Sequence, residues 1–217
     1  MKHTTQHLVH VRREYGQSVL DESVIRADPI EQFKIWFDDV LSQHHEDPTA
    51  MVLSTVDASG YPDSRVVLLK EVQPSGFVFF TNYLSAKGEQ LQHNPRAALN
   101  FYWPSLVRQV RVRGVVRKLD PEQSREYFSV RPRESQISAI ASPQSKIIPN
   151  RDFLEKNCRA IAEQYADNHP VPCPEFWGGY VLNPEEIEFW QGRDSRLHDR
   201  LRCMKQDGHW QYERLAP

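Results

Sequence analysis

Residue types that carry out chemistry are concentrated near the C-terminus, between Glu188 and Arg200. After Glu188 and Phe189, this stretch holds four residues that are cationic or can become so, two carboxylates and one large aromatic: Arg193, Arg196, His198, Arg200, Asp194, Asp199 and Trp190. Arginine binds phosphate or carboxylate through a planar fork of N–H donors, and histidine exchanges a proton near neutral pH. The stretch fits a site for an anionic, planar ligand, and it equally fits a solvated hairpin tip with surface ion pairs.

Two further cationic clusters stand beside hydroxyl or aromatic groups. One runs from Arg65 to Lys70, with Thr81 and Lys87 downstream, and the other combines Tyr127, Arg131, Ser135, Gln144 and Ser145. Each has the mixture that phosphate binding requires, a fixed positive charge beside hydroxyl or backbone donors. Taken alone, each cluster also fits a solvated face. Three of them in one aromatic-rich chain favour an enzyme that handles two phosphorylated ligands.

The first of these clusters raises a geometric question. Arg65 and Lys70 are five positions apart, so an ideal strand would direct their side chains to opposite faces. Either the two cations serve different phosphates, or the strand carries a bulge. The backbone between them can also offer N–H and C=O groups to a flat heterocycle.

Composition and charge exclude several classes of protein. The 217 residues are 39% hydrophobic, which suits one substantial core, and the formal net charge of −2 argues against a nucleic-acid partner. The three cysteines are far apart and form no C-x-x-C pair, so neither a metal site nor a disulfide framework is expected. No apolar run approaches the length of a membrane span, and residues 1–7 lack the apolar stretch of a signal peptide. We therefore expect a cytoplasmic location and no membrane partner.

Mostly short strands must position the three clusters. Apolar runs between Gly/Pro turns predict strands at 50–56, 64–72, 77–81, 97–103, 107–119, 179–182, 185–190, 201–206 and 209–214. Capping residues and apolar stripes predict helices at 28–45, 85–93, 120–131 and 150–165. The expected fold class is mainly β or α+β, an antiparallel barrel or sandwich with peripheral helices. A polar arm over 1–27 is expected to precede a single domain over 28–217.

Motifs along nearly the whole chain stand in the order and spacing of a known family. They include Arg12-Arg13-Glu14-Tyr15, Arg65-Val66-Val67-Leu68-Leu69-Lys70, Phe79-Phe80-Thr81-Asn82, Arg131-Pro132-Arg133, Gln144-Ser145, Phe176-Trp177-Gly178-Gly179, Phe189-Trp190-Gln191-Gly192 and Arg196-Leu197-His198-Asp199-Arg200. On these motifs the chain resembles the pyridoxine/pyridoxamine 5′-phosphate oxidases, FMN enzymes that form pyridoxal 5′-phosphate. The resemblance implies an antiparallel split β-barrel and a homodimer with FMN at the subunit interface.

The resemblance also implies roles for individual residues. The implied FMN-binding residues are Arg65, Val66, Val67, Leu68, Leu69, Lys70, Phe80, Thr81, Lys87, Gln109, Gln144, Ser145, Trp190 and Arg200. The implied substrate-binding residues are Lys70, Tyr127, Arg131 and Ser135 at the phosphate, Arg196, Leu197 and His198 at the ring, and Arg12, Arg13, Glu14 and Tyr15 as a lid. Arg196 and His198 are the implied catalytic residues. The implied substrates are phosphorylated B6 vitamers and O2.

Two departures from the family pattern bear on these roles. Ser85-Ala86-Lys87 stands where the family usually has Ser-Arg-Lys, so one expected donor to the FMN phosphate is lost. Ile137-Ser138-Ala139-Ile140 stands where the family favours Ile-Gly-Ala-Trp, which affects packing near the phosphate loop.

Other functions stay open at this point. A split-barrel flavin reductase would keep FMN but would not need the full set Tyr127, Arg131, Ser135, Arg196 and His198. Without catalysis, the barrel could carry a flavin or vitamer. It could also bind RNA through the basic strand face of Arg111, Arg113 and Arg117, in a salt-dependent manner.

Overall fold

The computed structural model describes residues 15–16, 18–43, 47–166 and 169–217. The chain forms two compact units. One comprises Met1–Pro48, Phe101–Arg111 and Glu186–Pro217, and the other comprises Thr49–Asn100 and Val112–Glu185. The prediction of an arm followed by a single domain stays a prediction. Among the described helices, none combines the length and apolarity that crossing a membrane would need.

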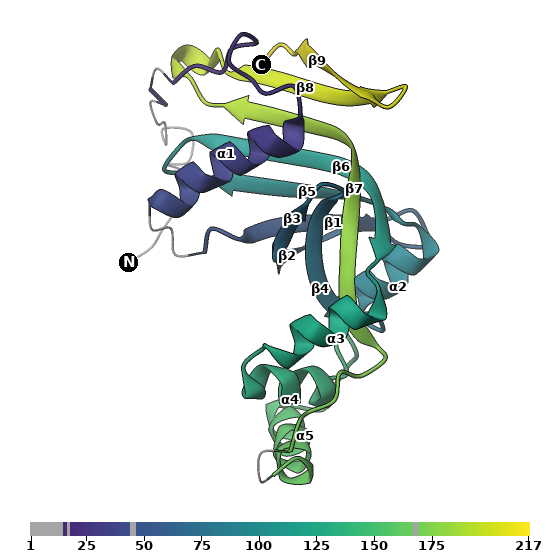
Figure 1. Ribbon diagram of the computed structural model, residues 1–217. Coiled ribbons are helices and arrows are strands. Elements are labelled where there is room, and N and C mark those ends of the chain that lie inside the picture. Colours follow the sequence, from purple (N-terminus) through teal and green to yellow (C-terminus); the bar gives the residue numbers. More distant parts are fainter. Residues whose placement is uncertain (1–14, 17, 44–46, 167–168) are drawn as a thin grey trace, which may run out of the picture. The chain divides into compact units, whose positions relative to one another are not determined.

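Antiparallel strands dominate the chain, as the sequence predicts (Figure 1). The strands are β1 (Ala50–Val56), β2 (Pro62–Leu68), β3 (Glu71–Gln73), β4 (Gly76–Asn82), β5 (Arg96–Trp103), β6 (Arg108–Lys118), β7 (Trp177–Gln191), β8 (Asp199–Gln206) and β9 (His209–Arg214). They pair in the order β2-β1-β5-β6-β7-β4-β3, with β8 added to β7 and β9 to β8. The helices are α1 (Pro29–Ser42), α2 (Ala86–His93), α3 (Pro121–Ser129), α4 (Arg133–Ala141) and α5 (Arg151–Gln164).

In the first unit, α1 begins where its capping residue predicts. The Asp28 carboxylate accepts a hydrogen bond from the Ile30 N–H at 2.8 Å and satisfies one open donor of the first turn. The helix buries one apolar face, in which the Phe33 ring lies 4.9 Å from Phe101 and the Trp36 ring meets Phe189 edge-on at 5.2 Å. The helix ends at Ser42, and the predicted end at 44–45 lies outside the described residues.

The β8–β9 hairpin turns tightly at Asp207-Gly208, between the strands predicted over 201–206 and 209–214. Asp207 and Gly208 both have positive φ, 49° and 83°, which is the backbone geometry of a two-residue hairpin turn.

The predicted strand over 64–72 is wrong, because the backbone changes partners inside it. β2 follows β1 as far as Leu68, and the Leu69 N–H then bonds to Thr49 O at 2.8 Å. The next N–H, of Lys70, bonds to Val78 O in β4 at 2.9 Å. Leu69 is buried at this step, with 3% of its surface exposed. The break between β2 and β3 therefore removes the strict alternation that would have separated Arg65 from Lys70.

The two strands predicted over 179–182 and 185–190 form one strand, β7. Its bend passes close to two glycines of the second unit. A Cβ on Gly76 would lie 1.9 Å from Leu182 O, and one on Gly114 would lie 2.0 Å from Asn183 O. β7 can continue through its bend because Gly76 and Gly114 have no side chain that would clash with its backbone.

Helix α4 was not predicted, and it follows α3 directly. Pro132 ends the predicted helix, yet its carbonyl also accepts the Ser135 N–H at 2.9 Å and so starts the next one. The buried Gln136 side chain donates to Phe128 O at 2.9 Å and to Ser129 O at 3.0 Å, which ties α4 to the end of α3. Because α4 has no clear apolar stripe, periodicity does not reveal it.

The helices of the second unit share a small core. Phe128, Ile137, Val171 and Trp177 form its buried centre, and α5 packs its predicted stripe against it through Cys158, Ile161 and Ala162. Within this unit, α3, α4 and α5 gather at one end of β4 and β7 (Figure 1).

Candidate active site

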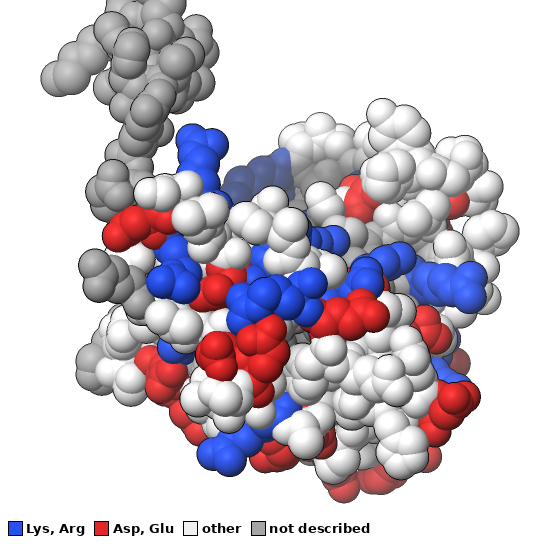
Figure 2. Space-filling view, turned by 90° about the horizontal axis from the view of Figure 1, so that it is seen from above, with Lys and Arg blue, Asp and Glu red and all other residues white. Residues whose placement is uncertain are grey.

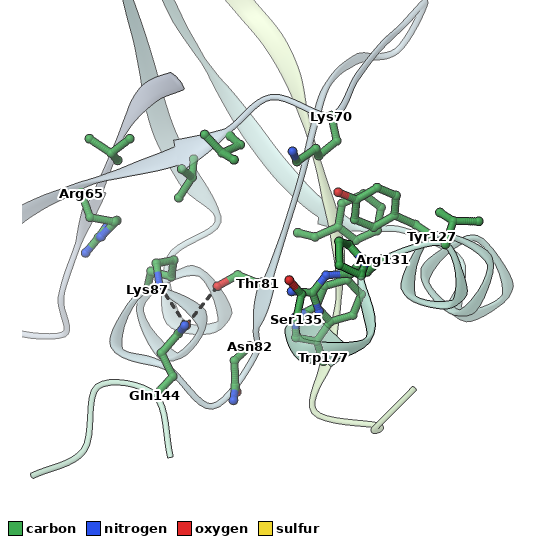
Figure 3. A pocket seen from close by; sticks show the side chains of 16 residues that line it. Arg65, Lys70, Thr81, Asn82, Lys87, Tyr127, Arg131, Ser135, Gln144 and Trp177 are labelled. Atoms are coloured by element: carbon green, nitrogen blue, oxygen red, sulfur yellow. Dashed lines mark hydrogen bonds between the residues drawn. The ribbon is translucent and has the colours of Figure 1, made fainter. Parts of the chain in front are cut away.

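The second unit contains a cavity of about 700 Å³. Residues from β2, the Lys70 link, β4, α2, α3, α4 and the start of β7 line it (Figure 3). The lining residues are Arg65, Val66, Val67, Leu68, Lys70, Phe80, Thr81, Asn82, Lys87, Tyr127, Val130, Arg131, Pro132, Ser135, Gln144 and Trp177. Two clusters that are distant in the sequence therefore meet in one cavity.

The lining of this cavity is strongly positive. It includes Arg65, Lys70, Lys87 and Arg131, and none of its described residues is a carboxylate. Charges of one sign within low-dielectric walls concentrate the opposite charge in a cleft. The cavity is therefore built for an anionic ligand.

One part of the cavity centres on Gln144. Its side-chain Oε1 accepts hydrogen bonds from Lys87 Nζ at 3.1 Å and from Thr81 Oγ1 at 3.3 Å (Figure 3). Burial, and secondarily the nearby charge of Arg65, lower the pKa of Lys87. A bound anion would offset both effects, because it restores a favourable partner for the ammonium group.

Arg65 lies in the same part of the cavity, but most of its N–H donors already form hydrogen bonds within the protein. Its Nη1 donates to Thr55 Oγ1 at 2.6 Å, and its Nη2 donates to Asp63 Oδ2 at 2.5 Å and Gln90 Oε1 at 3.0 Å. These bonds hold the guanidinium against β1 and α2. Arg65 therefore contributes charge to the cavity with few free donors.

The other part of the cavity contains Lys70, Tyr127, Arg131 and Ser135 (Figure 3). Burial lowers the pKa of Arg131, and its Nη1 atom is buried without a hydrogen-bond partner. A buried charged donor that lacks a partner is costly unless a ligand completes it. An anion bound beside Arg131 would supply the missing acceptor.

The residues of the cavity fit a phosphorylated flavin together with a second phosphorylated ligand. The ammonium group of Lys87 and the amide N–H groups of Gln144 provide donors in one part, and the unpartnered Arg131 Nη1 provides one in the other. Between them, Val66 and Leu68 of β2 remain exposed, at 64% and 38%, and offer an apolar surface to a flat ring. The donor chemistry is that of two separated phosphate sites.

A second set of predicted site residues meets in the first unit. The His198 ring lies 4.7 Å from Trp190 and 5.3 Å from Tyr15, measured between ring centroids, and Tyr15 meets both rings edge-on. The Arg193 N–H donates to His198 Nδ1 at 3.1 Å, which leaves the ring proton of neutral histidine on Nε2. Burial and the charge of Arg196 lower the pKa of His198. Neutral histidine is thus the favoured form.

Two arginines flank this histidine in different states. Arg196 is exposed and follows Ser195, and both residues have positive φ, 61° and 56°. Arg200 is tied down, because it donates to Glu188 Oε1 and to Ala216 O, each at 2.8 Å. Arg196 is therefore the more available of the two for a ligand.

Asp194 has a structural contact that sequence reasoning missed. Its Oδ1 accepts the N–H groups of Tyr15 at 3.1 Å and Gly16 at 2.8 Å. The acidic character of the stretch was visible, but the residues that the carboxylate would meet are nearly 180 positions away.

The predicted residues divide as follows. Twelve of them line the cavity: Arg65, Val66, Val67, Leu68, Lys70, Phe80, Thr81, Lys87, Tyr127, Arg131, Ser135 and Gln144. Leu69 is buried, and Gln109 and Ser145 are not among the lining residues. Tyr15, Trp190, Arg196, Leu197, His198 and Arg200 belong to the first unit. Arg12, Arg13 and Glu14 lie outside the described residues.

Sequence reasoning also missed four lining residues, Asn82, Val130, Pro132 and Trp177. Asn82 and Trp177 stand in motifs on which the family resemblance rests, so those motifs could have identified them as site residues. The effect of Ala86 stays a prediction, although the structure shows it as the first residue of α2, after the capping hydroxyl of Ser85.

One arginine of the strand face that suggested RNA is paired with an acidic residue. Arg111 Nη1 donates to Glu188 Oε2 at 3.1 Å. On the face drawn in Figure 2, Lys and Arg side chains are interspersed with Asp and Glu. The face drawn there therefore shows no uniform basic stripe of the kind that nucleic-acid binding requires.

Sequence models of two families match most of the chain. One, described as pyridoxamine 5′-phosphate oxidase, matches residues 37–165. The other, described as the pyridoxine 5′-phosphate oxidase C-terminal dimerisation region, matches residues 177–217. The second match supports the expected homodimer.

Curated relatives agree with these matches. The chain is 58% identical over 210 residues to the pyridoxine/pyridoxamine 5′-phosphate oxidase of Legionella pneumophila (strain Paris), covering 97% of each chain. It is 51% identical to the protein of that name from Pseudomonas paraeruginosa, covering 98% of this chain and 100% of the relative.

Solved structures share the fold. PhzG from Burkholderia lata, crystallised with tetrahydrophenazine-1-carboxylic acid, matches with a TM-score of 0.86 and 26% identity, covering 92% of this chain and 98% of that chain. A pyridoxamine 5′-phosphate oxidase-related, FMN-binding protein from Nostoc punctiforme matches with a TM-score of 0.69 and 17% identity, covering 88% and 98%.

The fold is that of the split-barrel proteins, which confirms the expected fold class, and the matching family binds FMN, which confirms the expected cofactor. Within that class, the chain belongs to the pyridoxine/pyridoxamine 5′-phosphate oxidase family.

Proposed function

We propose that this protein is an FMN-dependent oxidase that converts pyridoxamine 5′-phosphate and pyridoxine 5′-phosphate to pyridoxal 5′-phosphate. The alcohol and O2 give the aldehyde and H2O2. The amine, O2 and water give the aldehyde, NH3 and H2O2. Family membership at up to 58% identity supports the activity. A cytoplasmic location goes with this proposal and stays a prediction.

The observation that carries the proposal is the cavity with two separate groups of anion donors. Lys87, Thr81 and Gln144 suit the phosphate of FMN, with Arg65 adding charge. Lys70, Tyr127, Arg131 and Ser135 suit the phosphate of the substrate. Arg131 supports this division most directly, because its buried Nη1 lacks an acceptor.

Binding of the substrate phosphate orients the reacting carbon, although the phosphate lies away from that carbon. Bound FMN supplies the acceptor for the hydride from the substrate C4′ and passes the electrons on to O2. Arg131 and its neighbours hold the substrate by its phosphate, which does not react. The binding energy of that contact orients the other end of the substrate, which carries the reacting C4′. Positioning of this kind is the contribution expected of the second phosphate site.

Arg196 and His198 are proposed to complete the site at the substrate ring, with Trp190 and Arg200 at the flavin. We propose that they act in a homodimer with FMN at the subunit interface. The dimerisation region over 177–217 supports this arrangement, since it contains all four residues. Neutral His198 would donate one hydrogen bond at the ring through Nε2–H, and Tyr15 would help to exclude water.

The test combines the bound chromophore with turnover. The purified protein should show the absorbance of FMN and should consume O2 and release H2O2 when pyridoxamine 5′-phosphate or pyridoxine 5′-phosphate is added. NADH serves as the control substrate for a flavin reductase. Bound FMN that is inert towards both vitamers, or that is reduced only by NADH, would exclude the proposed activity.

A further inference from the structure

Trp177, which sequence reasoning did not single out, lies under the unpartnered cation of the cavity. It is the first residue of β7 and is 7% exposed. The guanidinium carbon of Arg131 lies 4.7 Å from the centroid of its ring, within the range of a cation–π contact. Figure 3 draws both side chains in the part of the cavity that holds Ser135.

The plane of the Trp177 ring is set by its aromatic neighbours. Phe80 stacks beside it at 5.4 Å with an interplanar angle of 14°, and Tyr127 stacks on Phe80 at 3.9 Å. Phe128 meets the Trp177 ring edge-on at 5.0 Å. A ring packed on several sides has little freedom to rotate, so it offers Arg131 a fixed face.

An aromatic face holds a cation differently from a carboxylate. A carboxylate offsets part of the guanidinium charge and accepts its N–H donors, as Asp63 does for Arg65 at 2.5 Å. The face of an indole attracts the charge and leaves the in-plane N–H groups free. Among the described residues no carboxylate pairs with Arg131, and its Nη1 lacks any acceptor.

A second arginine–tryptophan contact in the chain includes an acidic partner. Arg108 lies over Trp36 at 4.5 Å, but it also donates to Asp39 at 2.6 Å and to Gln191 at 3.0 Å. That arginine is fully engaged within the protein. The difference between the two tryptophan–arginine pairs is therefore the acidic partner, which only the pair outside the cavity possesses.

We propose that Trp177 is a positioning residue that holds Arg131 in place of an ion pair, so that the charge and donors of Arg131 face the substrate phosphate. Trp177 thereby sets the preference for phosphorylated over phosphate-free pyridine substrates. The proposal rests on the proposed function, because it takes the ligand of Arg131 to be the phosphate of a B6 vitamer.

The experiment compares W177M and W177F with the wild-type holoenzyme. Methionine fills apolar space without an aromatic face, whereas phenylalanine keeps a smaller face. The first measurement is kcat/KM for pyridoxamine 5′-phosphate divided by kcat/KM for pyridoxamine. The second is the dissociation constant of pyridoxal 5′-phosphate and of pyridoxal, by calorimetry. W177M should lower the phosphate preference about tenfold, through KM and not kcat, and W177F should lower it only about two- to threefold.

The matched control is W36M, which removes a buried tryptophan from beneath an arginine that does not line the cavity. It should lower the melting temperature and leave the phosphate preference unchanged. In a second control, R131Q and the double variant R131Q/W177M should show the same preference, because Trp177 acts through Arg131.

A folded W177M with the wild-type preference would overturn the proposal. If W177M does not fold, W177F must still lower the preference about two- to threefold, and an unchanged ratio would overturn the proposal equally. Failure of the proposed function has a different signature, since the wild type itself would then turn over neither phosphorylated vitamer. The ratio of the dissociation constants of pyridoxal and pyridoxal 5′-phosphate, measured by calorimetry, tests the role of Trp177 in either case.

Discussion

Arg65 and Arg131 carry the same charged group into one cavity and differ in what surrounds it. Arg65 donates to Asp63, Thr55 and Gln90, whereas Arg131 has a buried Nη1 without an acceptor. A saturated arginine mainly adds field, and an unsaturated one can bind a ligand directly. A phosphate would therefore gain more binding energy from contact with Arg131 than from contact with Arg65.

Replacing Arg196 with alanine should reduce turnover far more than it reduces FMN affinity. The side chain is exposed and follows a strained turn beside His198, so its loss removes a ligand contact without disturbing the core. Steady-state kinetics and fluorescence titration of FMN measure the two effects. A variant that merely releases FMN and has normal turnover when saturated would show that the assigned role at the substrate is wrong.

His198 should titrate below its ordinary pKa of 6.5. Burial and the positive charge of Arg196 both disfavour the protonated ring, and protonation at Nδ1 would also break the bond from the Arg193 N–H. The folded state then binds fewer protons than the unfolded state, so this residue costs stability as the pH falls through 6.5 and below. NMR titration of the ring should show the pKa rise in R196A. Equal values in both proteins would contradict the role of Arg196.

At the scale of elements, the break between β2 and β3 allows the cavity to form. The Leu69 N–H bonds beside β1, and the Lys70 N–H bonds to β4. This change of partner brings Lys70 to the same cavity as Arg65, although simple strand alternation would have separated them. The bulge that sequence reasoning left open is in fact a crossing from one strand partner to another.

Asp194 should hold the segment around Tyr15 onto the loop of His198. Its Oδ1 accepts two successive N–H groups, and its own N–H donates to Gly16 O at 3.3 Å. In D194A, amide hydrogen exchange at Tyr15 and Gly16 should become about tenfold faster or more, since a lost bond to a charged acceptor is worth about 1.5–3 kcal/mol. D194N retains an acceptor oxygen and should change exchange less. Protection that is the same in D194A and the wild type would exclude this anchoring.

At the scale of the whole molecule, the C-terminal dimerisation region and the proposed FMN site share residues. Trp190 and Arg200 both lie in the matched region 177–217. If FMN is bound at the subunit interface, cofactor binding and dimer formation must favour one another by linkage. The cofactor-free protein is therefore expected to be the less stable state.

FMN added to the cofactor-free protein should raise its melting temperature and strengthen its dimer. At a free concentration of 100 times the dissociation constant, the gain in stability is about 2.7 kcal/mol for each site. Thermal denaturation monitored by circular dichroism measures the first effect, and sedimentation equilibrium measures the second. Riboflavin, which lacks the phosphate, should stabilise less. Equal stabilisation by riboflavin would contradict the phosphate site formed by Lys87 and its neighbours.

Local sequence signals determined most elements of the fold. Asp28 and Asp120 each cap the helix that they predicted, and the Asp207-Gly208 turn forms where expected. Capping bonds and turn conformations depend on a few adjacent residues, so they can be read from the sequence. The phosphate-binding groups were recognisable for a related reason, because arginine, lysine and hydroxyl side chains have that chemistry in any fold.

The tertiary structure decided which of those groups meet and which are free. Helix α4 depends on the contacts of Gln136 with the end of α3, and the length of β7 depends on the close approach of Gly76 and Gly114. The importance of Trp177 depends on the absence of a carboxylate beside Arg131 among the described residues. Such features are set by atoms that are distant along the chain and adjacent only after folding, so no local pattern records them.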